Sequence, residues 1–139
     1  MPRVLITPLI FPHADTDPSI RALREAGWDI DFSWYRPDRT DEELGQRLAG
    51  IDAVIAGVDP FTERAFAKAD RLKLIARVGV GYDAIDIEAA SRHKVAVTIT
   101  IGVNNDAVAD YAMALLIAQA RQVVANHETV RAGAWKRFI

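Results

Sequence analysis

Short apolar runs alternate with helical patterns along the first part of the chain, and this alternation restricts the fold more than any other feature. The apolar runs occupy residues 4–6, 28–32, 52–56, 74–78 and 95–98. Helical patterns occupy residues 19–26, 40–48, 62–66 and 87–93 between them. Strands that alternate with helices predict βαβ units and a parallel sheet. We therefore predict an α/β domain with a five-stranded, mainly parallel sheet flanked by helices, in which the half-polar run 28–32 lies near an edge.

The fourth apolar run ends in two glycines one residue apart, Gly79 and Gly81, and Asp86 follows where a helix N-cap is expected. Glycine accepts positive φ and lets other groups approach the backbone closely. Successive free N–H groups in such a turn form a concave site for an anion, and ligands of open α/β sheets bind at the carboxyl ends of strands. The turn is a candidate anion site, although a Gly-x-Gly alone is equally consistent with a tight turn.

The last quarter of the chain has a different pattern. We predict one long helix from Ala107 to about Val130, capped by Asn105 or Asp106. Its first half is apolar almost all round, whereas a surface helix of a small domain has a polar face. We expect a second domain or a second subunit to cover it, because soluble monomers avoid an apolar patch of this size.

Composition excludes several classes of function. The net charge of −2 argues against a nucleic-acid partner. No apolar run approaches the ~20 residues that span a membrane, and the chain has no cysteine, which favours an intracellular, cytoplasmic protein. His13, Asp15 and Asp17 match no known metal-ligand spacing, so we predict no metal site.

Several ordered motifs together resemble the D-2-hydroxyacid dehydrogenase family, with the phosphoglycerate dehydrogenase branch closest. The motifs are Arg77-x-Gly79-x-Gly81-x-Asp83, Asp86-x-Glu88-Ala89-Ala90, Asn104-x-x-x-Val108-Ala109-Asp110 and Gly133-x-Trp135. The resemblance covers the chain from about Leu72 to its end. It implies a flavodoxin-like domain over residues 1–102, which binds substrate. It also implies a helical segment over residues 103–139, which lies between domains and at a two-fold subunit contact.

The resemblance also implies the ligands: NAD or NADP, and a small 2-hydroxy or 2-oxo acid whose carboxylate is held by the backbone N–H groups of Val80 and Gly81. Arg77 lies near the substrate in some members, but an ion pair with Asp83 is an equally good expectation. The positions that the resemblance assigns to substrate binding are Gly57, Val58, Arg77, Gly79, Val80 and Gly81, and those assigned to the cofactor are Val80, Asn104 and Val108.

The sequence departs from the family's pattern in two places and lacks part of its machinery. Asp59 adds a negative charge where the phosphoglycerate branch often has a basic residue, and Ala84 replaces a common asparagine. The chain contains no G-x-G-x-x-G, and its histidines match none of the family's catalytic positions. We therefore expect no catalytic residue in this chain. It should be the substrate-binding portion of a longer enzyme and inactive alone.

Two alternatives to an enzyme remain at this point. A non-catalytic sensor or corepressor on the same scaffold would keep the Gly-x-Gly turn, so only turnover distinguishes it. A receiver module needs clustered acids after the first strand and a phospho-acceptor after the third, where Asp59 is the sole acid. We expect this chain to form a symmetric homodimer whose contacts centre on Tyr111 to Trp135.

Overall fold

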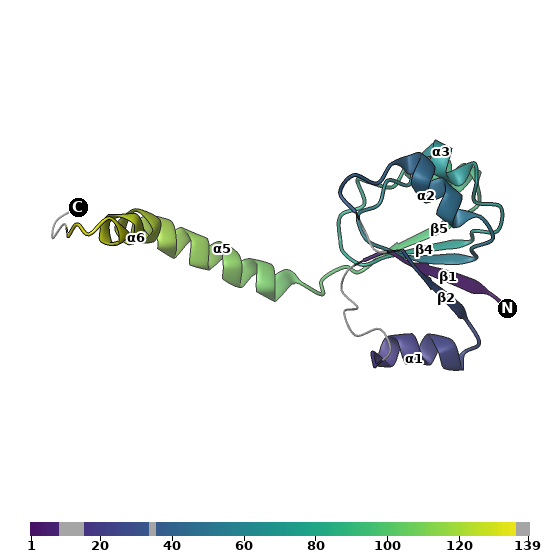
Figure 1. Cartoon of the computed structure of the whole chain (residues 1–139), viewed down its shortest axis with the longest axis horizontal. Coiled ribbons are helices and arrows are strands. Elements are labelled where there is room, and N and C mark those ends of the chain that lie inside the picture. Colours follow the sequence, from purple (N-terminus) through teal and green to yellow (C-terminus); the bar gives the residue numbers. More distant parts are fainter. Residues whose placement is uncertain (9–15, 34–35, 136–139) are drawn as a thin grey trace. The chain divides into compact units, whose positions relative to one another are not determined.

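The structure is a computed structural model that describes residues 1–8, 16–33 and 36–135 (Figure 1). It divides into two compact units, Met1–Ile101 and Gly102–Ile139. Among the described residues, none of the helices has the length and apolar character needed to cross a membrane. The roles that the resemblance gives to residues 1–102 and 103–139 stay predictions.

The first unit contains a five-stranded sheet in which every pairing is parallel, as the alternating pattern predicts. Its strands are β1 (Arg3–Ile6), β2 (Asp29–Phe32), β3 (Ala53–Ala56), β4 (Leu74–Arg77) and β5 (Ala96–Ile99). The order across the sheet is β2-β1-β3-β4-β5. β2 is an edge strand, so the prediction drawn from its half-polar pattern is confirmed.

Of the four helices in this unit, α1, α2 and α4 begin where a local side chain accepts from their first N–H groups, whereas α3 has no side-chain cap. They are α1 (Pro18–Glu25), α2 (Asp41–Leu48), α3 (Glu63–Phe66) and α4 (Ile87–Arg92). Asp17 accepts hydrogen bonds from the backbone of Ser19 and Ile20, so this residue caps α1. The helix α2 begins with a reciprocal capping box between Thr40 and Glu43. His13 and Asp15, which we considered with Asp17 as metal ligands, lie outside the described residues.

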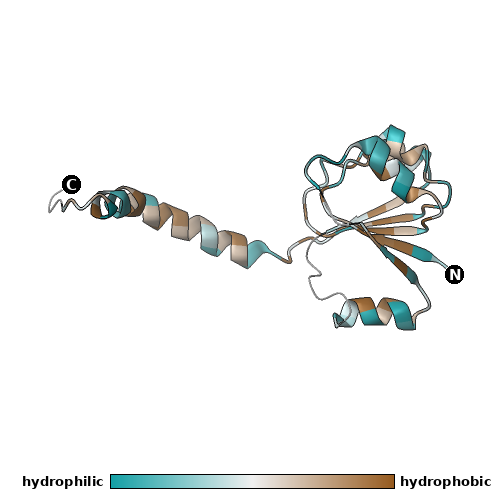
Figure 2. Cartoon of the chain, viewed as in Figure 1, coloured by the Kyte–Doolittle hydropathy of each residue, from teal (hydrophilic) through white to brown (hydrophobic). Residues whose placement is uncertain are grey.

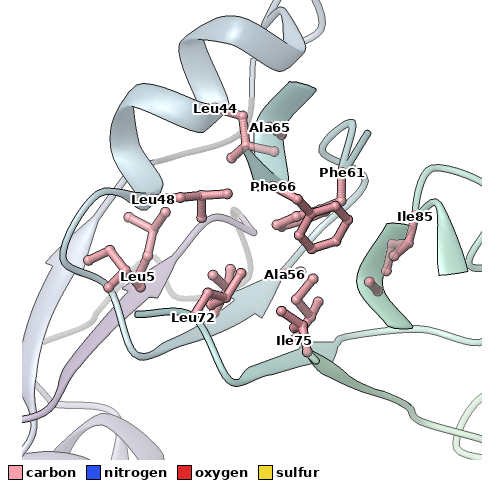
Figure 3. Packing of buried hydrophobic residues seen from close by; sticks show 14 of the residues in the cluster. Leu5, Leu44, Leu48, Ala56, Phe61, Ala65, Phe66, Leu72, Ile75 and Ile85 are labelled. Carbon is pink, nitrogen blue, oxygen red and sulfur yellow. The ribbon is translucent and has the colours of Figure 1, made fainter. Parts of the chain in front are cut away.

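The two faces of the sheet are packed unequally. α2, α3 and α4 cover one face with a continuous core that includes Leu44, Phe66 and Ile75 (Figure 3). On the other face, α1 contributes the buried Ile20, which packs with Val4 and Ile6 of β1. Burial of each such side chain is worth roughly 1.5–3 kcal/mol. The larger part of the hydrophobic core therefore lies on one face of the sheet. The carboxyl edge of the sheet is formed by loops.

The second unit corrects the prediction of one long helix. It consists of α5 (Asn105–Ala120) and α6 (Val123–Arg131), separated by Gln122 in a left-handed conformation with φ of 50°. Asn104, rather than Asn105 or Asp106, is the N-cap residue of α5, and its side chain makes no capping hydrogen bond. No glycine or proline marks the break, so the sequence pattern runs through it. No residue of α5 is buried, and apolar residues recur along this helix (Figure 2).

Candidate functional site

The candidate site lies at the carboxyl edge of the sheet, where the ends of the parallel strands come together. Thr7 follows β1, Gly57 and Val58 follow β3, the Gly-x-Gly turn follows β4, and Thr100 follows β5. Backbone hydrogen bonds continue the pairing beyond the strands: Thr7 N–H donates to Ile55 O at 3.0 Å. The start of the loop after β1 is thus fixed to the neighbouring strand β3 by a backbone hydrogen bond.

The Gly-x-Gly turn offers two open backbone donors. Gly79 is used within the protein, because its N–H donates to Thr100 Oγ1 at 2.8 Å and its carbonyl accepts from Thr100 N–H at 3.0 Å. The N–H groups of Val80 and Gly81 have no hydrogen-bond partner among residues 1–8, 16–33 and 36–135, and both residues are exposed. Two adjacent unpaired N–H groups fit the oxygens of a carboxylate.

The two glycines of the turn differ in backbone conformation. Gly79 has φ of +142°, which L side chains rarely adopt, whereas Gly81 does not lie in the positive-φ region. The positive-φ requirement for glycine therefore applies to Gly79 and not to Gly81. At Gly79, Thr100 holds both backbone polar groups.

Arg77 folds back over the turn. Its guanidinium donates to the carbonyl of Val78, and a Cβ added to Gly79 would overlap it. No ion pair joins Arg77 to Asp83, although both residues are described, so the alternative of an Arg77–Asp83 pair is not realised. The Asp83 carboxylate instead lies beside Gly81, 3.7 Å from the position a Cβ would take there. A cation and an anion thus flank the two open donors.

Asp59 does not face the candidate site, contrary to the expectation that it adds an open negative charge there. Its side chain is 0 % exposed, and Arg39, itself 5 % exposed, donates to Oδ1 at 2.6 Å. Thr7 Oγ1 donates to Oδ2 and accepts from Gly57 N–H at 2.9 Å. The expectation failed because the neutralising arginine is 20 residues away in sequence and no spacing rule connects the pair.

The same arginine reaches a further strand end. Arg39 Nη2 donates to the carbonyl of Ser33 at 2.9 Å and to its hydroxyl at 3.1 Å, and Ser33 N–H donates to Ile6 O at 2.9 Å. Thr7, Ser33, Arg39 and Asp59 therefore form one polar network beneath the loops. Sequence reasoning did not assign Thr7, Ser33 or Arg39 to the site. The available signal was that Thr7 directly follows β1 and Asp59 lies in the loop after the adjacent strand β3.

Val80 and Tyr82 are apolar residues at or next to the open donors in the chain, and Val58 follows the neighbouring strand β3. Val58, Val80 and Tyr82 are 49 %, 41 % and 51 % exposed. Together with the donor pair they make this edge a candidate anion site with exposed apolar residues. Such a combination suits a small organic acid better than a fully hydrated ion.

The two predicted cofactor residues outside the turn belong to the second unit. Asn104 caps α5, with its carbonyl accepting from Val108 N–H at 2.9 Å, and the Val108 side chain is 58 % exposed. Their contact with a cofactor stays a prediction. Within the part of the chain that the structure describes, no group of three His, Cys, Asp or Glu residues could hold a metal ion.

Comparison with known proteins gives one consistent result. Residues 5–135 match the family described as D-isomer specific 2-hydroxyacid dehydrogenase, catalytic domain. Similar relatives include a glyoxylate reductase of Pyrococcus furiosus, 41% identical over 97 residues, and D-3-phosphoglycerate dehydrogenase 2 of Arabidopsis thaliana, 34% identical over 138 residues. These matches cover 69% and 98% of this chain but 29% and 21% of the relatives. The chain thus spans less than a third of either protein.

Solved structures agree with the sequence matches. A protein of Thermus thermophilus superposes with a TM-score of 0.82 at 34% identity, covering 99% of this chain and 42% of that one. The NAD+-bound 3-phosphoglycerate dehydrogenase of Entamoeba histolytica superposes with a TM-score of 0.70 at 29% identity, covering 84% of this chain and 38% of that one. The sheet and its flanking helices are thus an arrangement that these proteins share.

Proposed function

Because this chain belongs to the D-isomer specific 2-hydroxyacid dehydrogenase family, we propose that it is the substrate-binding portion of an oxidoreductase that interconverts a D-2-hydroxy acid and its 2-oxo acid. The cofactor of the family is NAD or NADP, which supplies or accepts the hydride when bound. The contribution of this chain is to bind and orient the acid. The chemistry itself requires an acid–base group and a nicotinamide within reach of the same carbon.

The observation that carries the proposal is the pair of open N–H donors at Val80 and Gly81. A carboxylate that accepts both forms charge-assisted hydrogen bonds, which are stronger than neutral ones. Neither donor titrates, so the acid is held in the same way across the physiological pH range. The Arg77 guanidinium adds a positive charge beside the turn, and Val80 adds an apolar surface where we place the nicotinamide.

The identity of the acid is the finer part of the proposal. The Gly57–Val58 segment presents an apolar side chain and no cation, and the Arg39 charge beneath it is neutralised by Asp59. This favours a short, unphosphorylated acid of the glyoxylate type. A phosphoglycerate dehydrogenase is the second candidate, since the plant relative of that name aligns with 98% of this chain.

The test is turnover by the full-length gene product with NADH and with NADPH. We expect reduction of glyoxylate with a kcat/KM at least about tenfold above that for 3-phosphohydroxypyruvate, because an unpaired phosphate beside Val58 forfeits charge-assisted hydrogen bonds. The reverse order would assign the phosphoglycerate branch. Saturable binding of a 2-oxo acid without turnover by either cofactor would instead favour the sensor or corepressor class and overturn the proposal.

A further inference from the structure

Buried side chains hold the Gly57–Val58 segment through a hydrogen-bond network that does not include the open N–H groups of Val80 and Gly81. Both oxygens of Asp59 are engaged, Oδ1 by Arg39 and Oδ2 by the hydroxyl of Thr7. The Thr7 hydroxyl in turn accepts from Gly57 N–H at 2.9 Å. Gly57 is therefore fixed to β1 by its N–H, and Asp59 is fixed by its side chain, with Val58 between two anchored residues.

We propose, on the basis of the proposed function, that Thr7 and Asp59 are positioning residues that place the Gly57–Val58 segment against the bound 2-oxo acid. Neither side chain touches the acid in this arrangement, because both are fully buried. They act through the backbone. Because Thr7 occupies the Gly57 N–H, the next donor of the segment, Val58 N–H, is left without a partner among the described residues.

The composition of the network argues for positioning rather than for stability alone. A buried ion pair adds little net stability compared with apolar side chains of the same shape. What it adds is direction, because each hydrogen bond fixes the angle as well as the distance between two atoms. Here the directed bonds join the ends of β1 and β2 to the loop after β3, through Thr7, Arg39 and Asp59. In the sheet order β1 lies directly beside β3, and β2 is the next strand beyond β1.

Thr7→Val in the full-length enzyme is the sharpest test. Valine keeps the shape and the branched Cβ but removes the hydroxyl, which frees Gly57 N–H and leaves Arg39 paired with Asp59. We avoid Asp59→Asn as the main variant because it leaves a buried guanidinium without a counter-charge, which can prevent folding. Thr7→Ser restores the hydroxyl and serves as the conservative rescue.

We expect Thr7→Val to raise KM for the 2-oxo acid about tenfold to a hundredfold, the loss that follows from a misplacement of about 1 Å. Thr7→Ser should restore KM to within about threefold of the wild-type value, since it keeps the directed hydrogen bond. Val4→Ala, a truncation of a buried residue near the other end of β1, is the control for stability. It should lower Tm while KM stays unchanged.

Each outcome has a defined meaning. If Thr7→Val lowers Tm as Val4→Ala does and KM of the folded enzyme does not move, the network is structural and the inference is wrong. A failure of serine to restore KM would also contradict it. If the wild-type enzyme does not turn over any 2-oxo acid, the proposed function fails instead. Faster amide exchange at Gly57 in Thr7→Val then still reports whether the network holds the segment.

Discussion

At the scale of single residues, the two glycines of the turn have separate tasks. Gly79 is required by its backbone, since its φ of +142° is costly for any L side chain and its polar groups are bound to Thr100. Gly81 has an ordinary φ, and an added Cβ would meet only the Asp83 carboxylate at van der Waals distance. The value of glycine at position 81 is therefore access to its N–H.

This separation predicts that substitution of Gly79 acts mainly on stability and substitution of Gly81 mainly on KM. Gly79→Ala should lower the free energy of unfolding by about 1–2 kcal/mol, because alanine adopts the positive-φ region poorly and its Cβ displaces the Arg77 guanidinium. Gly81→Val should raise KM for the acid more than it lowers Tm, because the side chain crowds the carboxylate site. Thermal unfolding and steady-state kinetics on both variants decide the matter. Unchanged KM in folded Gly81→Val would mean that the turn does not bind the acid.

The turn also shows how far single residues can be predicted from sequence. The assignment of Val80 and Gly81 as donors rests on the family resemblance, because a Gly-x-Gly alone is equally consistent with a tight turn. The environment of Asp59 could not be predicted, because it depends on Arg39, which the fold brings from the loop before α2. Local motifs specify backbone conformation, whereas the charge state of a site depends on long-range contacts. The open donors at Val80 and Gly81 remain a predicted binding site.

At the scale of elements, α3 and α4 are joined by a cluster of charges around Glu63. Arg92 donates to one carboxylate oxygen at 2.7 Å and His93 Nε2 lies 2.8 Å from the other, while the His93 ring stacks on Phe66. The hydrogen bond from His93 and then that from Arg92 hold the pKa of Glu63 below its ordinary value. Glu63 in turn raises the pKa of Arg92.

The lowered pKa of Glu63 predicts a pH dependence of stability. The pKa of Glu63 is about 4.3 in the unfolded chain and lower in the folded protein. At pH values between these two pKa values the unfolded chain binds more protons than the folded protein does. The free energy of unfolding therefore falls as the pH falls through this interval. Tm should therefore drop less between about pH 6 and pH 3 in Glu63→Gln than in the wild type. Glu88→Gln, whose side chain is 93 % exposed, is the control and should follow the wild type. Parallel curves for all three proteins would contradict the assignment.

The elements themselves were predictable to the extent that their signals are local. The capping box of α2 and the Asp86 cap of α4 mark helix starts within a residue, because both act on the adjacent backbone. The break between α5 and α6 escaped prediction because Gln122 takes the left-handed conformation without a glycine, proline or asparagine to signal it. A continuous apolar pattern therefore does not guarantee a continuous helix.

At the scale of the whole molecule, the apolar character of α5 is the main unexplained surface. Large side chains along it are more than half exposed, namely Val108, Tyr111, Met113, Leu115, Leu116 and Ile117. Burial of each is worth roughly 1.5–3 kcal/mol, so leaving them in water is unfavourable. We predict that a second copy of the chain covers them through residues 111–135.

We expect the chain to be a dimer in light scattering at micromolar concentration, because apolar burial along α5 favours association. Leu116→Lys places a charge in the predicted contact and should shift the mass toward the monomer. Glu25→Lys, on the exposed surface of α1, changes charge in the other unit and should leave the dimer intact. A monomer mass for the unmodified chain at all concentrations would contradict the predicted homodimer.

The position of β1 has a consequence for synthesis of the protein. β1 leaves the ribosome before the other strands of this sheet, yet it lies between β2 and β3 in the finished sheet. Its partner Asp29–Phe32 follows early, but a two-stranded sheet is marginal in water, and the other edge of β1 stays open until Ala53–Ala56 emerges. Open strand edges on nascent chains promote aggregation. We therefore expect this domain to depend most on chaperones while the segment between β2 and β3 is being translated.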